Sequence, residues 1–404
     1  MLDINTLKSE IQAMEEEVIS YRRQVHRMAE TGGVEYNTSA YIKTKLEEFN
    51  IPYDTMEGTG ILGIIDTGKE GPHIGLRADF DALPVPEDAC NLKQERVVIS
   101  DTPDKTCHAC GHDAHTAMLL GAAKILSEHK EDLKGIIYLA FESGEEIGAG
   151  YGPMMKALEP YHIDTFWAIH VLNYIPAGQI CVQAGPRMAG GGVIDVTFVG
   201  KGGHGSRPDL SANPVFCAAN FVTNLAAAFV NQIDANETVT LGVTSIQGGE
   251  AANIFPDTAK VIGTIRFYNQ SEGKKALDII KKVAEGTASY SKCRAEFGPW
   301  MNMVGSPLIN DEYYSNMIEE RLRGIVGKEN VVHAQPWYAS ESFSRYLQNW
   351  PGVMAHLGIR NEEYGSGAEH HNSKFDVDES VLTLGVLSTV EYVLGVLENG
   401  LKPE

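Results

Sequence analysis

The sequence predicts an α/β fold, with a mixed central sheet flanked by helices and a smaller α+β domain inserted into it. Short apolar runs that read as strands alternate with longer stretches of helical periodicity. Several of these runs end on polar side chains, as strands do at the site edge of an α/β sheet. A glycine-rich link at residues 183–192 interrupts this alternation of strands and helices. We therefore predict one larger domain from residues 1–185 and 300–404, interrupted by a smaller domain of residues 186–299.

Helical periodicity and short apolar runs define the elements of the larger domain. Its first part contains a helix at 11–27, strands at 61–65 and 73–76, a helix at 113–128, and strands at 135–141 and 166–169. Its second part contains helices near 313–325 and 343–348, a strand at 353–357 and a closing helix at 379–397. Three strands or turns end on residues that can bind metal ions, which is how α/β folds assemble sites.

The smaller domain is predicted from a different order of elements. It contains a strand at 193–199, a helix at 214–230, strands at 239–246 and 260–267, and a helix at 273–288. Strands that follow one another directly favour an antiparallel sheet, and the helices between them favour a compact α+β sandwich.

The charge balance limits the classes of partner. The chain has 54 acidic residues against 33 Lys and Arg, which gives a formal net charge of -21 and opposes binding to nucleic acid or to an anionic membrane. The N-terminal residues lack the basic and apolar regions of a signal peptide, and we expect no apolar run to reach the length of a membrane span. We therefore predict a cytoplasmic protein, with reduced thiols, that binds small molecules and cations.

One short stretch, from Cys107 to His115 (C-H-A-C-G-H-D-A-H), carries thiol and imidazole groups, and the pair Glu145-Glu146 follows it. Thiolate, imidazole and carboxylate are the usual ligands of a divalent transition metal. A Cys-x-x-Cys redox pair or half of a structural zinc site is the alternative. However, the chain has no second Cys pair to complete a zinc cage, and a redox pair would not account for the histidines. The stretch therefore predicts half of a metal site.

Taken singly, the candidate ligands have ordinary explanations. His112 and His115 lie one helical turn apart, so both could face one metal, but either could instead cap or pack the helix. A Glu-Glu pair alone is more often a solvated turn. The other histidines also have ordinary explanations. His170 could be a buried histidine at a strand end, His204 could belong to a flexible Gly-Gly-His-Gly turn, and His370-His371 could be an exposed loop pair. Only the joint occurrence of these residues indicates a functional site.

The joint pattern resembles the co-catalytic metallopeptidase family of aminoacylases and glutamate carboxypeptidases. Within this family it resembles the amidohydrolase branch that contains hippurate hydrolases and indoleacetyl-amino-acid hydrolases. The resemblance extends over nearly the whole chain. The segments that carry it are Leu76–Pro84, His108–His115, Gly144–Glu146, Ile169–His170, Gly202–His204, Asn253–Asp257, Arg266 and His371. It implies a zinc-peptidase-like catalytic domain with an inserted lid and dimerisation domain.

The same resemblance implies a centre of two divalent metal ions, manganese or zinc first and cobalt or nickel as alternatives. The implied ligands are Cys110, which bridges the two ions, His112, Glu146, His170 and His371. The chemistry agrees with this arrangement, because an amide is a poor electrophile. A metal pair polarises its carbonyl and lowers the pKa of bound water to about 7.

Four further residues receive roles from the resemblance. Glu145 acts as the general base and then protonates the leaving amine. His204, on the inserted domain, donates to the tetrahedral oxyanion. In relatives this histidine often comes from the partner subunit, which implies a homodimer joined through the inserted domains. Asn253 and Arg266 bind the carboxylate of the amino-acid half of the substrate.

Some positions depart from the usual pattern of the branch. Glu142 stands where Gln usually precedes the glutamate pair, which adds a carboxylate near the site. The proline that usually follows the last ligand is absent, so His370 competes with His371 for that role. The spacing to Phe375 favours His371. Cys107 adds a thiol to which we assign no role.

The sequence therefore predicts a binuclear metal-dependent amidohydrolase that cleaves N-acyl-L-amino acids into a carboxylic acid and a free amino acid. A dipeptidase or carboxypeptidase with the same machinery is the rival enzyme. A non-catalytic metal-binding protein is the rival from another class, and the presence of both Glu145 and the full ligand set argues against it. No motif identifies the acyl group.

Overall fold

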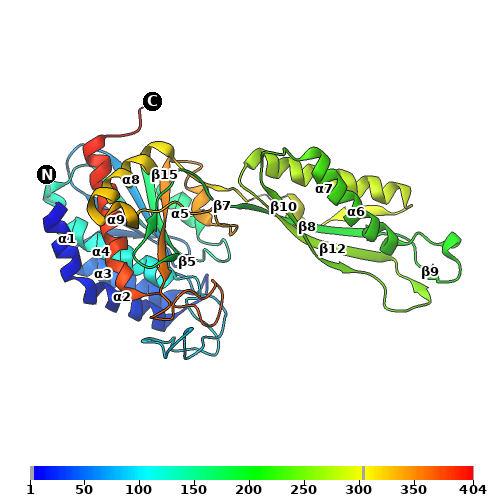
Figure 1. The fold of residues 1–404 in the computed structure, drawn as a ribbon, viewed down its shortest axis with the longest axis horizontal. Helices are drawn as coiled ribbons and strands as arrows, with labels where there is room; N and C mark the ends of the chain where they lie inside the picture. Colours follow the sequence, from blue (N-terminus) through cyan, green and yellow to red (C-terminus); the bar gives the residue numbers. More distant parts are fainter. Residues whose placement is uncertain (1–3, 303–304, 404) are drawn as a thin grey trace. The chain divides into compact units, whose positions relative to one another are not determined.

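The computed structural model describes residues 4–302 and 305–403, and the chain forms two compact units (Figure 1). Unit 1 consists of Met1–Gly185, Ile309–Gln335 and Arg345–Glu404, and unit 2 consists of Pro186–Leu308 and Pro336–Ser344. The larger domain was predicted to resume at residue 300, but residues 300–308 and 336–344 group with unit 2. One physical reason is that Met301 is fully buried in the core of unit 2.

Unit 1 is built on a seven-stranded mixed sheet with the order β1-β2-β4-β3-β5-β15-β6. Its strands are β1 (Tyr53–Thr55), β2 (Ile61–Asp66), β3 (His73–Asp79), β4 (Ile136–Glu142), β5 (Thr165–Pro176), β6 (Ile180–Cys181) and β15 (Gly352–Arg360). The central strands β4, β3, β5 and β15 are parallel, and β1, β2 and β6 pair antiparallel. Strands that are buried on both faces read as continuous apolar runs, as β4 and β5 do. This architecture confirms the predicted fold class.

Helix α4 lies at the centre of the packing in unit 1. The helices of this unit are α1 (Ile4–Ala13), α2 (Glu15–Met28), α3 (Tyr36–Glu48), α4 (His112–Glu128), α5 (Tyr151–Leu158), α8 (Glu312–Val326) and α9 (Leu382–Asn399). Helix α4 packs against α2, α9 and β3. Small residues permit this close approach, because a side chain at Gly121 would meet Val18 and Val386. The packing fixes the first residue of α4, His112, relative to the sheet.

Several helices differ from those predicted for the larger domain. The predicted opening helix is in fact two helices, α1 and α2, which are separated at Met14. The helix predicted near 343–348 is a short 3-10 turn at Ser342–Arg345. Helices α3 and α5 were not predicted. The large apolar residues that α3 buries are Ile42 and Leu46, which are too few to form a clear apolar stripe.

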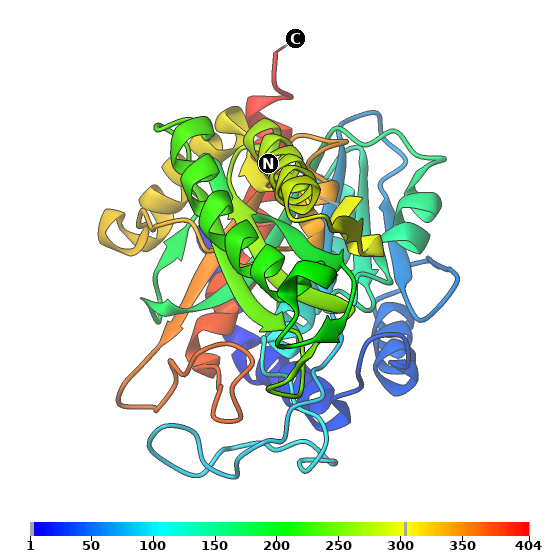
Figure 2. The ribbon, with the colours of Figure 1, turned by 90° about the vertical axis from the view of Figure 1, so that its right-hand side faces the viewer.

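Unit 2 is a two-layer α+β structure. Its main strands are β8 (Gly190–Val199), β10 (Val239–Gln247), β12 (Thr258–Phe267) and β13 (Arg294–Phe297), in the antiparallel order β10-β12-β8-β13. Helices α6 (Pro214–Gln232) and α7 (Gln270–Tyr290) pack side by side over this sheet (Figure 2). Strands β9 (Gly203–His204) and β11 (Ile254–Phe255) form a separate small ribbon, and β7 (Gly185–Met188) and β14 (Leu308–Asn310) stand at the boundaries of the two units. Alternate residues of β8 and β12 are buried beneath the helices.

Two helical segments are long and apolar enough to cross a membrane by length and composition alone, namely α6 and Glu379–Asn399, which contains α9. The expectation that no apolar run reaches this length was therefore wrong. In the second segment 78% of the apolar window is buried inside the protein, and in α6 33% is buried. The burial of α9 identifies it as a core helix of unit 1.

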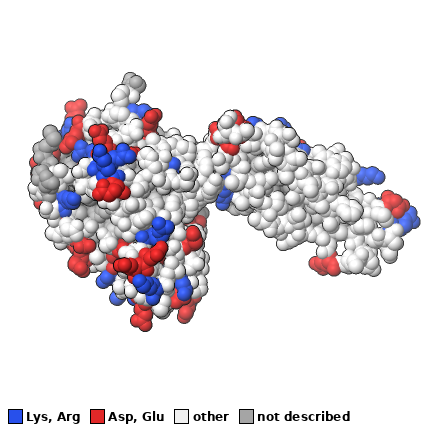
Figure 3. All heavy atoms as spheres, in the orientation of Figure 1, with Lys and Arg blue, Asp and Glu red and all other residues white. Residues whose placement is uncertain are grey.

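Charged side chains are unevenly distributed over the face that Figure 3 shows. Acidic and basic groups alternate on unit 1, and they are sparse along the middle of unit 2. Among the described residues on this face, Lys and Arg do not gather into a patch of the kind that binds nucleic acid.

Candidate metal centre

A glycine at the start of α4 brings Cys110 and His112 to the sheet. Gly111 has a φ of +86°, in the left-handed region, and a side chain there would lie 2.4 Å from Val171 Cγ2 on β5. The residue before Val171 is His170, and its Nε2 lies 3.6 Å from Cys110 Sγ. The close approach at Gly111 therefore brings together three of the predicted ligands.

His112 has one nitrogen held by the protein and one without a hydrogen bond. Its Nδ1 lies 3.1 Å from Asp81 Oδ1, a contact in which the imidazole donates to the carboxylate. Burial alone would lower the pKa of His112, but Asp79 and Asp81 raise it well above its usual value, so a cation that binds at Nε2 must displace a proton there. The buried Nε2 makes no hydrogen bond with the described residues and lies 3.8 Å from Glu146 Oε1. Leaving such an atom without a partner costs free energy, and a bound cation would satisfy it.

Glu146 and His371 meet on the more exposed side of the cluster. His371 Nε2 lies 3.3 Å from Glu146 Oε1, and the His371 side chain is 52% exposed. Glu146 N donates to the second oxygen of Asp81 at 3.1 Å, so Asp81 orients two predicted ligands. His371 has a φ of +62° and donates its backbone N–H to Ala109 O at 2.8 Å. Few non-glycine residues adopt this conformation, and such residues cluster at functional sites.

Ligand atoms converge in four groups of three, and within each group they lie within 4.8 Å of one another. The groups are Cys110, His112 and His170; Cys110, Glu146 and His371; His112, Glu145 and Glu146; and Asp79, His112 and His115. The first two groups share Cys110, as a bridging thiolate requires. A donor set of thiolate, imidazole and carboxylate suits first-row divalent ions. The residues present therefore fit a centre of two metal ions.

The sequence left His115 open as a metal ligand beside His112, and the hydrogen bonds of His115 argue against that role. Its Nδ1 lies 2.6 Å from Asp79 Oδ1, and its Nε2 accepts the backbone N–H of Val171 at 2.9 Å. Because both ring nitrogens are occupied, His115 positions β5 beside the cluster and offers no lone pair to a metal. The group that contains Asp79 therefore has the least support as a metal site among the four.

His370 and His371 both reach the cluster, at different places. His370 Nδ1 lies 3.7 Å from Cys110 Sγ, and its ring packs against Phe375. Burial, with help from neighbouring histidines, lowers the pKa of His370 to about 3. Among the described residues, His371 belongs to one of the four groups and His370 to none. His370 nevertheless borders the proposed bridging thiol, which agrees with its place in the sequence prediction as the alternative to His371.

Burial dominates the electrostatics of the thiol and the neighbouring imidazole. It raises the pKa of the Cys110 thiol well above its usual value, although the nearby His112 acts in the opposite direction. Burial also lowers the pKa of His170 well below its usual value. Both groups are therefore neutral in the absence of a cation, and a cation that binds here must displace the thiol proton.

The remaining predicted site residues lie on unit 2. His204 is exposed on β9, where it stands opposite Ile254 of β11. The next residue, Gly205, donates its N–H to Asn253 O at 2.8 Å, so the structure brings His204 and Asn253 close together. Arg266 lies separately on β12, where burial lowers its pKa from the usual value. Their roles toward substrate stay predictions.

A mixed α/β sheet whose strand ends bring thiol, imidazole and carboxylate groups together is the arrangement of a metal-dependent hydrolase. The model of the Peptidase family M20/M25/M40 matches residues 75–393, and the chain belongs to this family. This finding confirms the resemblance drawn from the motifs.

Individual relatives and a solved structure support the same assignment. The chain is 33% identical over 391 residues to thermostable carboxypeptidase 1 of Saccharolobus solfataricus, covering 95% of this chain and 96% of that protein. It is also 33% identical over 371 residues to IAA-amino acid hydrolase ILR1-like 4 of Arabidopsis thaliana, covering 91% and 83%. The crystal structure of the Bacillus subtilis YXEP protein, a dinuclear metal binding peptidase, matches with a TM-score of 0.80 and 29% identity, covering 96% and 99%.

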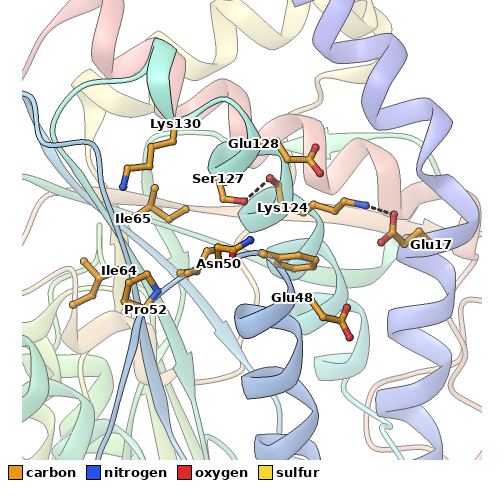
Figure 4. A pocket seen from close by; sticks show the side chains of 12 residues that line it. Glu17, Glu48, Asn50, Pro52, Ile64, Ile65, Lys124, Ser127, Glu128 and Lys130 are labelled. Carbon is orange, nitrogen blue, oxygen red and sulfur yellow. Dashed lines mark hydrogen bonds and ion pairs between the residues drawn. The ribbon is translucent and has the colours of Figure 1, made fainter.

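A separate hollow of about 560 Å³ lies at the other end of α4, beside α2 and β2 (Figure 4). Lys124 and Glu17 form an ion pair of 2.6 Å across one side of it, and Ile64, Ile65 and Pro52 line the other side. Lys124 lies three turns along α4 from His112, so this hollow is distinct from the ligand cluster.

Proposed function

We propose that the protein hydrolyses the amide bond of N-acyl-L-amino acids and releases a carboxylic acid and a free amino acid. The observation that carries the proposal is the group formed by His112, Glu145 and Glu146, which places a second carboxylate beside two candidate metal ligands. A carboxylate next to a metal site is what activation of a bound water requires. The plant relative is named as a hydrolase of such an amide conjugate.

Five residues would hold the two ions: Cys110 as the bridge, with His112, Glu146, His170 and His371. When bound, a pair of divalent ions polarises the scissile carbonyl and lowers the pKa of a bound water to about 7. We propose that both ions are manganese or both are zinc, and the same donors would also suit cobalt or nickel. Asp81 serves this set by keeping the His112 lone pair on Nε2 and by holding the backbone of Glu146.

The proton transfers are assigned to one side chain. Glu145 takes the proton from the attacking water and returns it to the nitrogen of the leaving amine. His204 is proposed to donate to the oxyanion of the tetrahedral intermediate. Asn253 and Arg266 are proposed to bind the carboxylate of the amino-acid half, since a guanidinium can grip a carboxylate with two hydrogen bonds.

We further propose that the protein is a homodimer joined through unit 2. Strand β10 is at one edge of the four-stranded sheet, and an exposed edge can pair with another chain. Phe216 and Val230 on α6 are 69% and 85% exposed, so this helix carries an apolar surface that a partner would cover. In a dimer of this kind His204 would act on the partner's substrate.

A panel of substrates tests the activity and separates it from its rivals. Hydrolysis of N-acyl-amino acids, dipeptides and longer peptides is measured with added manganese, zinc, cobalt or nickel. We expect turnover of the N-acyl-amino acids, and the loss of about 100-fold or more of kcat in Glu145→Ala. Preference for dipeptides or for longer peptides would favour a dipeptidase or a carboxypeptidase, the activity named for the archaeal relative.

Two further outcomes decide between catalysis and metal binding alone. Cys110→Ala should lose both metal and activity, whereas Glu145→Ala should keep its metal. Full turnover in Glu145→Ala would refute the mechanism, and metal binding without hydrolysis of any panel member would favour a non-catalytic protein.

A mixing experiment tests the proposed dimer. Inactive His204→Ala and Glu145→Ala chains are mixed under conditions where subunits exchange. Activity should return, and no return would count against a shared site.

A further inference from the structure

Glu142 ends β4 inside a buried group of charges beneath the ligand cluster. Its Oε2 accepts hydrogen bonds from Arg77 Nε and from the Tyr346 hydroxyl, both at 2.9 Å. Arg77 also donates from Nη1 to Asp79 Oδ2 at 2.8 Å. None of these four side chains has more than marginal contact with solvent. Glu142 and Asp79 stand opposite each other on the paired strands β4 and β3, so one guanidinium lies between two carboxylates.

This group is connected to the candidate metal ligands. Asp79 Oδ2 lies 3.7 Å from His112 Nε2, the nitrogen that makes no hydrogen bond with the described residues. Asp79 Oδ1 lies 2.6 Å from His115 Nδ1, and the other nitrogen of His115 accepts the N–H of Val171, which follows His170. A change at Glu142 can therefore reach the ligands through Arg77 and Asp79.

Stability alone does not explain a buried cluster of this composition. In many proteins, replacing a buried ion pair by apolar residues of similar volume leaves the stability of the fold unchanged or raises it, because removing charges from water is costly. Among the described contacts one arginine faces two carboxylates, so these three groups together carry a formal charge of one negative unit. Glutamine, the usual residue of the amidohydrolase branch at position 142, would accept the same hydrogen bonds but would leave the group without that charge.

We propose that Glu142 is a positioning residue that strengthens the binding of divalent cations at the neighbouring centre. Its carboxylate offsets the charge of Arg77 and holds that guanidinium in place, so Asp79 keeps its negative charge directed at the edge of His112. An anionic environment beneath the ligands favours a doubly charged ion. This inference rests on the proposed metal centre and assigns a function to the carboxylate by which this chain departs from its branch.

The test measures the affinity for metal directly. The full-length protein is freed of metal by chelation and titrated with manganese in a calorimeter. We expect Glu142→Gln to bind manganese about 10-fold more weakly than the wild type. Tyr346→Phe is the matched control, because it removes another hydrogen bond to the same oxygen without changing the charge. Its affinity should equal that of the wild type.

Two additional measurements distinguish the charge effect from a general disturbance. Glu142→Asp keeps the charge and should bind manganese more tightly than Glu142→Gln. At saturating manganese, Glu142→Gln should recover a kcat close to that of the wild type, whereas a distorted site would not. Equal affinities for the wild type and Glu142→Gln, or an equal loss in Tyr346→Phe, would overturn the inference. If the wild type itself binds neither manganese nor zinc, the proposed metal centre is wrong. That result differs from a failure of the Glu142 inference, because none of the variants would then bind metal either.

Discussion

His26 and Asp113 form a buried ion pair that fastens the first turn of α4 to α2. His26 Nδ1 lies 2.8 Å from Asp113 Oδ2, and neither side chain is more than 2% exposed. His26 Nε2 lies 2.7 Å from Glu87 Oε1, and Arg22 Nε donates to the same oxygen of Asp113 at 2.8 Å. Burial alone would lower the pKa of His26, but its hydrogen bonds with the two carboxylates raise that pKa to about 9.

The raised pKa of His26 predicts how stability depends on pH. The histidine has a pKa of about 9 in the folded protein, whereas its ordinary pKa is about 6.5. Its contribution is therefore fully present below pH 6.5 and is lost as the pH rises through 9. We expect the free energy of unfolding to fall over this interval by roughly 3 kcal/mol. Thermal unfolding of the metal-free protein, followed by circular dichroism from pH 6 to pH 10, measures the change.

His26→Gln is the matched variant for this prediction. Glutamine can still donate a hydrogen bond to a carboxylate, but it takes up no proton over the tested range. We expect the variant to be less stable than the wild type at pH 6, and we expect the difference between the two proteins to shrink toward pH 10. If the difference stays constant with pH, His26 is not the titrating group.

Asp81 predicts a second measurable effect, on metal affinity. It contacts His112 Nδ1 and accepts the N–H of Glu146, each at 3.1 Å. Asparagine cannot serve both donors equally, since one of its two terminal atoms is itself a donor. We expect Asp81→Asn to bind manganese 10- to 100-fold more weakly in calorimetry. Asp66→Asn, at the exposed end of β2, is the control and should bind as the wild type does. Unchanged affinity in Asp81→Asn would contradict the positioning role.

The hydrogen bonds of His115 predict that it can be replaced without the loss of a metal ion. His115→Gln should keep two ions per chain, as measured by elemental analysis after dialysis, because neither ring nitrogen is available as a ligand. It should unfold at a lower temperature, since Asp79 and the N–H of Val171 lose their partner. By contrast, His112→Gln should lose metal. A loss of one ion from His115→Gln would make it a ligand after all.

The contiguous parts of the site were predictable from the sequence because local spacing determines them. Cys110 and His112 flank one glycine, and Glu145-Glu146 follows an apolar strand, so each pair could be placed on an element before any tertiary contact was known. The fold class was predictable for the same reason, since the apolar runs of β4 and β5 are those of strands buried on both faces.

Tertiary contacts that join distant segments were not predictable from the pattern. The role of Asp81 depends on how the end of β3 meets both α4 and the turn that holds Glu146. The approach of His370 to Cys110 joins residues 260 positions apart. Glu142 was recognised as a departure, but its contacts with Arg77 and Tyr346 depend on strand pairing. No regular spacing in the sequence predicts contacts of this kind between distant segments.

Gly111 provides the last prediction, which concerns the backbone that sets the ligands in place. Gly111→Ala places a side chain at a φ of +86°, which costs about 1–2 kcal/mol, and brings it to 2.4 Å from Val171 Cγ2. Gly68 is the matched control, because it also has a positive φ, +69°, but its added side chain meets nothing within 4 Å. Both variants should lose stability, and Gly111→Ala should lose more. Manganese affinity should fall in Gly111→Ala alone, because relief of the clash with Val171 moves Cys110 and His112 away from His170. If calorimetry finds equal affinities in the two variants, the close approach of α4 to β5 does not hold the ligands together.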